Sequence, residues 1–160
     1  MAKRRYWLMK SEPGTYSIDD LEREGRTMWE GVRNYQARNL MRDDCRVGDL
    51  VLFYHSSAKP PGVAGLAKVS SEPYPDPTQF EENAPYYDAT SDPKDPRWIL
   101  VDVEHVETFD EVLPLNNLKA QPELADMLVV QRGQRLSVMP VDKPHFKRVC
   151  LLAGAKTKIR

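Results

Sequence analysis

Five short runs of apolar residues, some of them alternating with polar residues, predict β-strands. In the fourth run Ile99, Val101 and Val103 alternate with acidic residues, which is typical of a strand with one face in water. The second and third runs flank a Pro-Pro-Gly loop and predict a hairpin. The predicted strands are residues 6–10, 50–56, 63–69, 98–107 and 135–139.

Helix signals lie between these strands. The last is the clearest, because Phe146, Val149, Cys150 and Ala153 recur at helical spacing and a glycine follows. The other predicted helices begin with residues that can cap free backbone N–H groups or that suit a first turn. We expect Ser17 to cap the first helix, Asn34 to cap a helix over 35–42, Pro122 to begin a helix that runs to Met127, and Asp142 to cap a helix that ends at Gly154.

Strands interspersed with short helices predict an α+β protein built on a small mixed sheet or barrel. The length of 160 residues suits a single domain over residues 1–160. No segment of about 20–50 residues repeats along the chain, which argues against a solenoid.

Charge is distributed unevenly, although 23 basic and 24 acidic side chains nearly balance. Residues 71–96 hold seven acidic side chains, one lysine and six of the 13 prolines. Because proline lacks a backbone donor, this segment predicts a long acidic surface loop. A linker between two domains is the alternative, but about 70 residues on each side would be small for independent folding. The rest of the chain holds 22 basic and 17 acidic side chains, so one face can be basic.

Membrane and secretory signals are weak in this sequence. Runs free of polar residues, such as 149–155, are all far shorter than the roughly 20 residues that span a bilayer. The apolar stretch after the basic start ends at Lys10, too early for a signal peptide. Cys45 and Cys150 have no CxxC spacing, which argues against a zinc knuckle or a disulfide framework. Two unpaired thiols suit a reducing compartment, so we expect a cytoplasmic protein with no membrane partner.

Motifs of common enzymes are absent from the sequence, among them GxGxxG, the P-loop, HExxH and GxSxG. His55, His105 and His145 lie 40 or more residues apart, which gives no metal-ligand spacing. His55 follows two aromatic residues at a strand end, where binding residues are common, and a site role and a structural role are equally open for it. We expect no catalytic residue, no metal site and no cofactor.

Three blocks place aromatic rings beside polar side chains: residues 6–13, 29–34 and 52–56. A planar heterocycle needs an apolar or aromatic surface for its face and donors and acceptors for its edge. Trp7 and Phe53, taken singly, are more readily explained as core residues. The residues by themselves indicate a folded domain with a candidate aromatic–polar pocket.

In their order along the chain, these blocks resemble the EVE domain family. The match continues with blocks at 65–69, 74–76, 98–103, 135–138 and 140–141 and covers about residues 5–152. The resemblance implies a PUA-like fold, a small mixed β-barrel of about five to six strands flanked by short helices, related to the YTH readers of methylated adenine in RNA. It also implies a non-enzymatic module that captures a modified nucleobase, which is 5-methylcytosine or oxidised cytosine in DNA or a modified base in RNA.

On this resemblance, we expect a flipped or single-stranded base to stack on Trp29 or Tyr54 and to place a methyl group against Val32. Hydroxyl and amide side chains would read its edge, and basic residues would hold phosphates. The expected base-pocket residues are Lys10, Ser11, Trp29, Val32, Arg33, Asn34, Phe53, Tyr54, His55, Ser56 and Ser137, and the expected phosphate-binding residues are Arg38, Arg42 and Arg135.

Two other classes of function stay open. A nucleotide- or nucleobase-processing enzyme would use His55 as acid or base, although no partner carboxylate or nucleophile stands at a motif spacing. A protein-interaction module would bind a protein partner through the acidic segment 71–96. The sequence does not decide between DNA and RNA.

Overall fold

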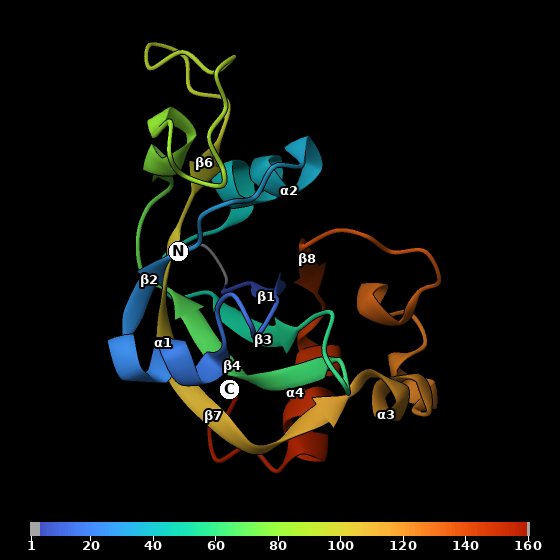
Figure 1. Ribbon diagram of the computed structural model, residues 1–160. Coiled ribbons are helices and arrows are strands. Elements are labelled where there is room, and N and C mark those ends of the chain that lie inside the picture. The colour runs from blue at the N-terminus through green and yellow to red at the C-terminus, as the bar shows by residue number, and fades with distance from the viewer. Residues whose placement is uncertain (1–3, 160) are drawn as a thin grey trace.

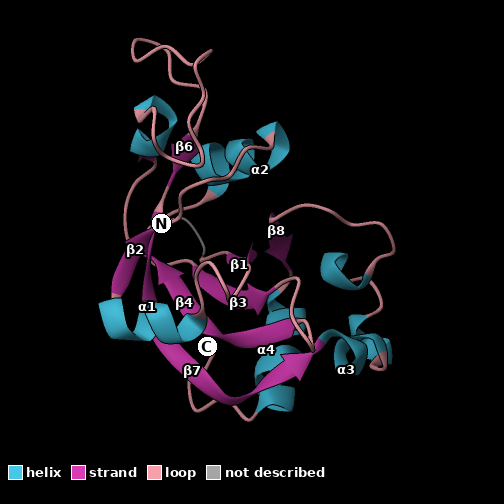
Figure 2. Ribbon diagram, viewed as in Figure 1, coloured by secondary structure: helices cyan, strands magenta, loops and turns pink. Residues whose placement is uncertain are grey.

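A six-stranded mixed sheet that curls into a half-barrel forms the centre of the protein (Figures 1 and 2). The structure, a computed structural model, describes residues 4–159. The strand order is β2-β7-β4-β3-β1-β8, with β1 and β3 parallel and the other neighbours antiparallel. The bounds are β1 Tyr6–Ser11, β2 Arg26–Met28, β3 Leu50–His55, β4 Gly62–Val69, β7 Asp102–Pro114 and β8 Val138–Val141. A separate pair joins β5 (Tyr74–Pro75) to β6 (Ile99–Leu100).

Four short α-helices surround this sheet: α1 Ile18–Glu24, α2 Tyr35–Asn39, α3 Leu115–Lys119 and α4 Lys143–Ala153. Ser17 and Asp20 form a reciprocal capping box at the start of α1, and the Asn34 side chain accepts the Ala37 N–H at the start of α2. A π-helical turn (Leu40–Asp44) follows α2, and 3₁₀ turns lie at Pro77–Phe80, Pro122–Leu124 and Leu128–Val130. Within residues 4–159, no helix combines the length and the apolar composition needed to cross a membrane.

Two hydrophobic cores lie on the two faces of the sheet, and β1 and β3 contribute to both. Tyr6 and Leu8 of β1 join the core that α4 covers through Phe146, whereas Trp7 and Met9 join the core on the opposite face. Because side chains alternate along a strand, a strand buried on both faces must be apolar at successive positions. This requirement explains the continuous apolar runs in the sequence.

The predicted strands and helices are confirmed in outline, with several differences. A 3₁₀ turn, Pro122–Leu124, stands where a helix to Met127 was predicted, and the helix predicted over 35–42 becomes π-helical at Leu40. Asp142 precedes α4 but makes no side-chain cap. The predicted strand 98–107 is divided at Val101, so that β6 pairs with β5 while β7 continues for 13 residues along β4. The last predicted strand begins only at Val138, and β8 pairs with β1 at one end of the strand order. Gly154 ends α4 in the left-handed conformation, as predicted.

The segment 71–96, predicted to be a surface loop, is irregular and at least partly exposed over most of its length, but it also holds ordered and buried residues. It projects from the sheet on the same side as α2 (Figure 1) and holds β5 and the 3₁₀ turn Pro77–Phe80. Asp76, Thr78 and Gln79 are buried, although acidic and amide side chains are usually exposed. The physical reason is that each of them has hydrogen-bond partners inside the protein, which removes the penalty for burial.

Glu107 on β7 holds the C-terminal tail. Its carboxylate accepts hydrogen bonds from the backbone N–H groups of Lys156 and Thr157 and from the Thr157 hydroxyl, at 2.6–3.1 Å. Burial acts to raise the pKa of Glu107, but these hydrogen bonds outweigh it and hold the pKa below its usual range. The charged carboxylate therefore stabilises the fold at neutral pH, and this contribution is lost as the pH falls through the lowered pKa.

Glu107→Gln is expected to lower the free energy of unfolding by about 1 kcal/mol at neutral pH, allowing for partial solvent access. The difference from wild type should vanish in acid, where the wild-type carboxyl is protonated as well. Urea unfolding over a range of pH measures both values. Glu104→Gln is the control, because its exposed pair with Lys68 should contribute less than about 0.5 kcal/mol. A pH-independent difference for Glu107→Gln would contradict the assignment.

Candidate functional site

A cleft of about 880 Å³ opens where the end of β1, the chain around β2 and the segment 78–86 meet. Its volume lies within the range of about 300–1,000 Å³ that is usual for ligand pockets. Eight of the predicted site residues line this cleft: Lys10, Ser11, Trp29, Val32, Arg33, Ser56, Arg135 and Ser137.

Trp29 and Val32 provide the apolar wall of the cleft. Both are mostly buried, and the Trp29 backbone N–H donates to the carbonyl oxygen of Val101 at 2.9 Å. The Trp29 ring meets the ring of Phe53 edge to face, with centroids 5.4 Å apart. Phe53 is fully buried behind Trp29, so it supports the wall and does not reach the cleft.

Gly31 allows the segment 78–86 to approach this wall. Its φ of +84° lies in the left-handed region that glycine adopts without strain. A Cβ atom at this position would lie 2.5–2.7 Å from three ring atoms of Tyr86. The Tyr86 ring therefore packs directly on the glycine backbone, and both residues line the cleft.

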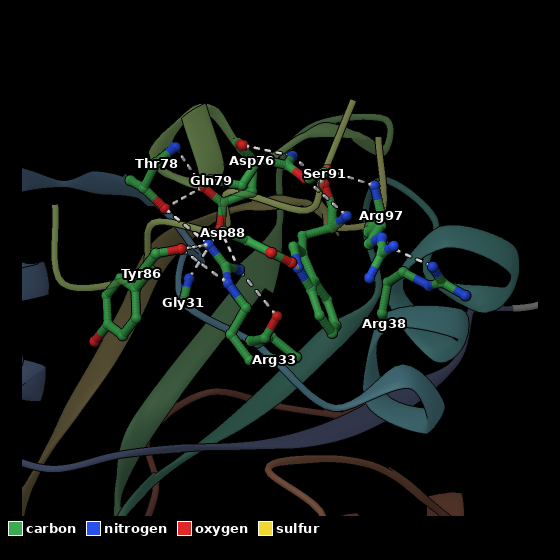
Figure 3. A network of polar contacts seen from close by, with 12 residues as sticks. Gly31, Arg33, Arg38, Asp76, Thr78, Gln79, Tyr86, Asp88, Ser91 and Arg97 are labelled. Carbon is green, nitrogen blue, oxygen red and sulfur yellow. Dashed lines mark hydrogen bonds and ion pairs between the residues drawn. The ribbon is translucent and has the colours of Figure 1, made fainter. Parts of the chain in front are cut away.

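Arg33 holds the segment 76–86 against the cleft (Figure 3). Its Nε and Nη2 donate to the Tyr86 carbonyl oxygen at 3.1 and 2.6 Å, and Nη2 also donates to the Thr78 hydroxyl. Its Nη1 donates to the Val32 carbonyl and to Asp76 Oδ2, both at 3.1 Å. A guanidinium has five N–H groups, so every donor of Arg33 is used inside the protein. The structure thus gives Arg33 a structural task at the edge of the cleft.

Asp76 is the buried partner of Arg33, with only 2% of its side chain exposed. Its Oδ2 also accepts the Gly31 backbone N–H at 3.0 Å, and its Oδ1 accepts the N–H and the hydroxyl of Thr78 (Figure 3). One carboxylate therefore joins the two chain segments that form this side of the cleft. A buried charge with this many donors is well satisfied.

Gln79 secures the same segment to the start of β6. Its amide nitrogen donates to the carbonyl oxygens of Asp76 and Trp98, and its amide oxygen accepts from the Ser91 hydroxyl and the Trp98 N–H. The Trp98 indole N–H donates to Asp88 at 2.7 Å. These hydrogen bonds, and not a hydrophobic core, hold the segment 76–98 in place.

Planar groups stack beside this network. The Tyr35 and Trp98 rings lie 4.8 Å apart and nearly parallel. The Arg38 guanidinium covers the Tyr35 ring at 4.8 Å, and that of Arg33 lies 5.3 Å from the Trp98 ring. Arg38 also donates to the Arg97 carbonyl oxygen at 2.6 Å (Figure 3), so the stack fastens α2 to the segment.

Lys10, Ser137 and Arg135 are predicted site residues whose polar side chains line the cleft and could meet a ligand. The backbone N–H of Lys10 donates to the Ser137 carbonyl oxygen at 2.8 Å, which places both side chains at the same part of the wall. Burial lowers the pKa of Lys10, and its ammonium lies 5.8 Å from the Tyr54 ring centroid. Arg135 is exposed at the rim.

Six of the predicted site residues do not line the cleft. Asn34 caps α2, and the side chains of Phe53 and Tyr54 belong to the hydrophobic cores. Arg38 and Arg42, expected to bind phosphates, have separate partners inside the protein. Arg38 donates to the Arg97 carbonyl oxygen, and Arg42 pairs with Asp43 at 2.8 Å in the π-helical turn that follows α2. The sixth residue is His55.

His55 has a structural partner. Its Nε2 accepts the backbone N–H of Ile18 at 3.1 Å, which satisfies a free donor in the first turn of α1. Burial lowers the pKa of His55, and Asp19 opposes this effect only partly. The residue on which the enzyme alternative relied therefore has a structural task at the start of α1.

Thirteen of the residues that line the cleft were not predicted, among them Tyr16, Glu30 and Tyr86. Burial, and after it the carboxylates of Asp76 and Glu81, raise the pKa of Glu30. Glu30 lies inside the block 29–34 that resembles the EVE domain family, so the sequence could have indicated it as a site residue. Tyr86 comes from the segment expected to be a surface loop, and no local pattern marks its approach to Gly31.

Comparison with known proteins relates the chain to a described family. The model of the EVE domain matches residues 5–152. Human thymocyte nuclear protein 1 is 42% identical over 166 residues, which cover 92% of this chain and 73% of that protein.

Solved structures show the same architecture. A crystal structure of the human THYN1 protein, described as a complex with DNA that contains 5-methylcytosine, is 40% identical, has a TM-score of 0.85 and is matched over 97% of this chain and 99% of that chain. A protein from Pseudomonas syringae is 45% identical, with a TM-score of 0.89 over 92% of this chain and 99% of that chain. The predicted α+β, PUA-like fold is confirmed.

Proposed function

The chain belongs to the EVE domain family, and we propose that it binds DNA and captures a modified cytosine in the cleft beside Trp29. One observation carries the proposal: the cleft joins an apolar wall of Trp29 and Val32 to polar side chains of Lys10, Ser137 and Arg135. A base needs such a combination, because its face is apolar and its edge is polar. The complex of the human relative with DNA containing 5-methylcytosine supports the same class of ligand.

The modification would be sensed at the apolar wall. A methyl group placed against Val32 gains only about 1 kcal/mol by burial, and a pocket distinguishes one methylene by about 1–3 kcal/mol. The preference for 5-methylcytosine over cytosine is therefore expected to be modest. An oxidised cytosine carries a polar group, and hydrogen bonds to that group can separate it further from cytosine.

The phosphates would meet few basic side chains at the cleft. Arg33 has used all its donors, and Arg38 and Arg42 have partners away from the cleft. Arg135 and Lys10 are the predicted basic residues at the cleft whose cationic groups have no hydrogen bond or ion pair within the described residues. Affinity for unmodified DNA should consequently be weak and sensitive to salt.

Arg135→Gln is expected to weaken binding of a short oligonucleotide that contains 5-methylcytosine and to reduce the slope of log affinity against log salt by about one. The physical reason is the loss of one phosphate contact and of the counterion that it displaces. Fluorescence anisotropy at a series of salt concentrations gives both quantities.

Arg42→Gln is the matched control, because the same change is made at an arginine that pairs with Asp43 outside the cleft. Its affinity and salt slope should equal those of wild type. Oligonucleotides with unmodified cytosine and RNA of the same sequence complete the series. Equal affinity of wild type for modified and unmodified DNA would contradict the proposed function. Tighter binding of RNA than of DNA would indicate that the ligand is RNA.

A cytoplasmic location stays a prediction. Cys45 and Cys150 are both free and buried, and burial raises the pKa of each thiol. Thiols in this state are poor nucleophiles, which agrees with structural roles in the two cores.

A further inference from the structure

The apolar wall of Trp29 and Val32 cannot separate 5-methylcytosine from thymine, because both bases carry the same methyl group. The two bases differ at position 4 of the ring. Cytosine has an amino group there, which donates hydrogen bonds, and thymine has a carbonyl oxygen, which accepts them. A cleft that captures a modified cytosine and rejects thymine therefore needs a hydrogen-bond acceptor for that amino group.

Most polar side chains of the cleft do not supply this choice. Lys10 and Arg135 only donate, and a hydroxyl group such as that of Ser137 can turn to donate or to accept, so it suits either base. The Ser11 hydroxyl, expected to read the base edge, donates to the Tyr16 carbonyl oxygen at 2.6 Å. An ionised carboxylate accepts hydrogen bonds and never donates them. The carboxylate residues that line the cleft are Glu12, Glu24, Glu30 and Glu81.

Glu30 is the carboxylate residue that adjoins the apolar wall, because it directly follows Trp29 in the chain. Both of its neighbours are fixed. The Trp29 N–H donates to the Val101 carbonyl oxygen at 2.9 Å. The Gly31 N–H donates to Asp76 Oδ2 at 3.0 Å (Figure 3). The backbone of Glu30 is therefore held beside the surface on which the face of a base would lie.

The Glu30 carboxylate is free to meet a ligand. The residue is exposed, and within residues 4–159 its carboxylate has no hydrogen bond and no ion pair. Burial of part of the side chain, and after it the charges of Asp76 and Glu81, raise the pKa of Glu30 against an opposing effect of Arg33. Since these carboxylates repel Glu30, a ligand N–H that donates to Glu30 would relieve part of the repulsion.

We infer that Glu30 makes the cleft selective for cytosine bases over thymine by accepting a hydrogen bond from the 4-amino group of the captured base. The inference rests on the proposed function, since it assumes a base in the cleft with its face on Trp29. A bound thymine would turn its carbonyl oxygen toward the same carboxylate, and two acceptors repel each other. Val32 would thus meet the methyl group, and Glu30 would decide which methylated pyrimidine is held.

Glu30→Gln tests this inference, because the amide keeps the shape of the side chain but can accept or donate. Wild type should bind a short single-stranded oligonucleotide with one 5-methylcytosine roughly 10-fold more tightly than the same oligonucleotide with thymine at that position. In Glu30→Gln this ratio should fall below about 3, since the amide can turn to suit either base. The ratio is the quantity to compare, because loss of a negative charge strengthens the binding of both oligonucleotides.

Glu82→Gln is the matched control. It makes the same change of charge at an exposed residue that does not line the cleft, so its ratio should equal that of wild type. Fluorescence anisotropy at one salt concentration gives each affinity. Melting curves show whether Glu30→Gln folds as wild type does, which is expected because the carboxylate has no partner in the free protein.

The outcomes separate the inference from the proposed function. An unchanged ratio in Glu30→Gln, or equal binding of 5-methylcytosine and thymine by wild type, would overturn the inference alone. A ratio lost in Glu81→Gln and kept in Glu30→Gln would assign the amino group to Glu81, and a lowered melting temperature of Glu30→Gln would reveal a structural partner; either result overturns the inference. Equal affinity of wild type for 5-methylcytosine and cytosine would overturn the proposed function, because Glu30 does not distinguish these two bases.

Discussion

Asp76→Ala is expected to lower the free energy of unfolding by about 3–5 kcal/mol, the largest effect of any single polar substitution near the cleft. The change removes the carboxylate and leaves the largely buried Arg33 guanidinium without its charged partner. It also leaves the Gly31 N–H and the Thr78 N–H without an acceptor. Urea unfolding gives the loss of stability, and hydrogen exchange should show faster exchange of the amides in residues 76–98.

Asp43→Ala is the matched control. Its partner Arg42 forms an exposed pair with it, and such pairs contribute little to stability, so this variant should unfold much as wild type does. A loss below about 1 kcal/mol for Asp76→Ala would mean that water replaces the carboxylate. The segment would then have to be held mainly by Gln79 and the stacked rings.

Gly31→Ala is expected to lower the free energy of unfolding by about 2–5 kcal/mol and to weaken capture of a modified base. The left-handed backbone at Gly31 costs a residue with a Cβ roughly 1–2 kcal/mol. The new methyl group would also collide with the Tyr86 ring, and such overpacking typically costs about 1–3 kcal/mol. Displacement of Tyr86 changes the wall of the cleft, which oligonucleotide titration would detect.

Gly133→Ala separates the two contributions to this loss. Gly133 has a φ of +79°, and no atom lies within 4 Å of the position that a Cβ would take. Its substitution should show the backbone cost alone, about 1–2 kcal/mol, with unchanged binding. If both glycine variants lose the same stability and bind alike, the contact between Gly31 and Tyr86 does not shape the cleft.

The fold was largely predictable because the strands in the sheet centre are apolar on both faces. Among the elements that escaped prediction, β2 and α3 did so for a common reason. β2 consists of three partly or fully exposed residues, and α3 has five residues with one buried leucine. Neither segment has a hydrophobic period long enough to be recognised. β2 forms because β7 offers partners for its backbone hydrogen bonds, and α3 forms because it packs against β7.

Part of the lining of the candidate cleft could be predicted from the sequence, but the contacts of the predicted residues could not. The blocks that contain Lys10, Trp29 and Ser137 do meet at one cleft. The task of Arg33 depends on Asp76 and Tyr86, which lie 43 and 53 positions away in the sequence. A guanidinium beside an aromatic block looks the same in sequence whether its donors are free or used. The same holds for His55, whose partner Ile18 lies 37 positions away.

The side of the cleft formed by Glu81, Ala84, Pro85 and Tyr86 has a consequence for how recognition can diverge among relatives. This side belongs to a segment fastened through polar contacts to Arg33, Gln79 and Trp98, while the sheet and its two cores are built without it. Insertions or exchanges at residues 81–97 can therefore reshape the cleft with little strain on the sheet. Natural substitutions in this segment, or a grafted segment, could change which base the cleft prefers while the sheet stays the same.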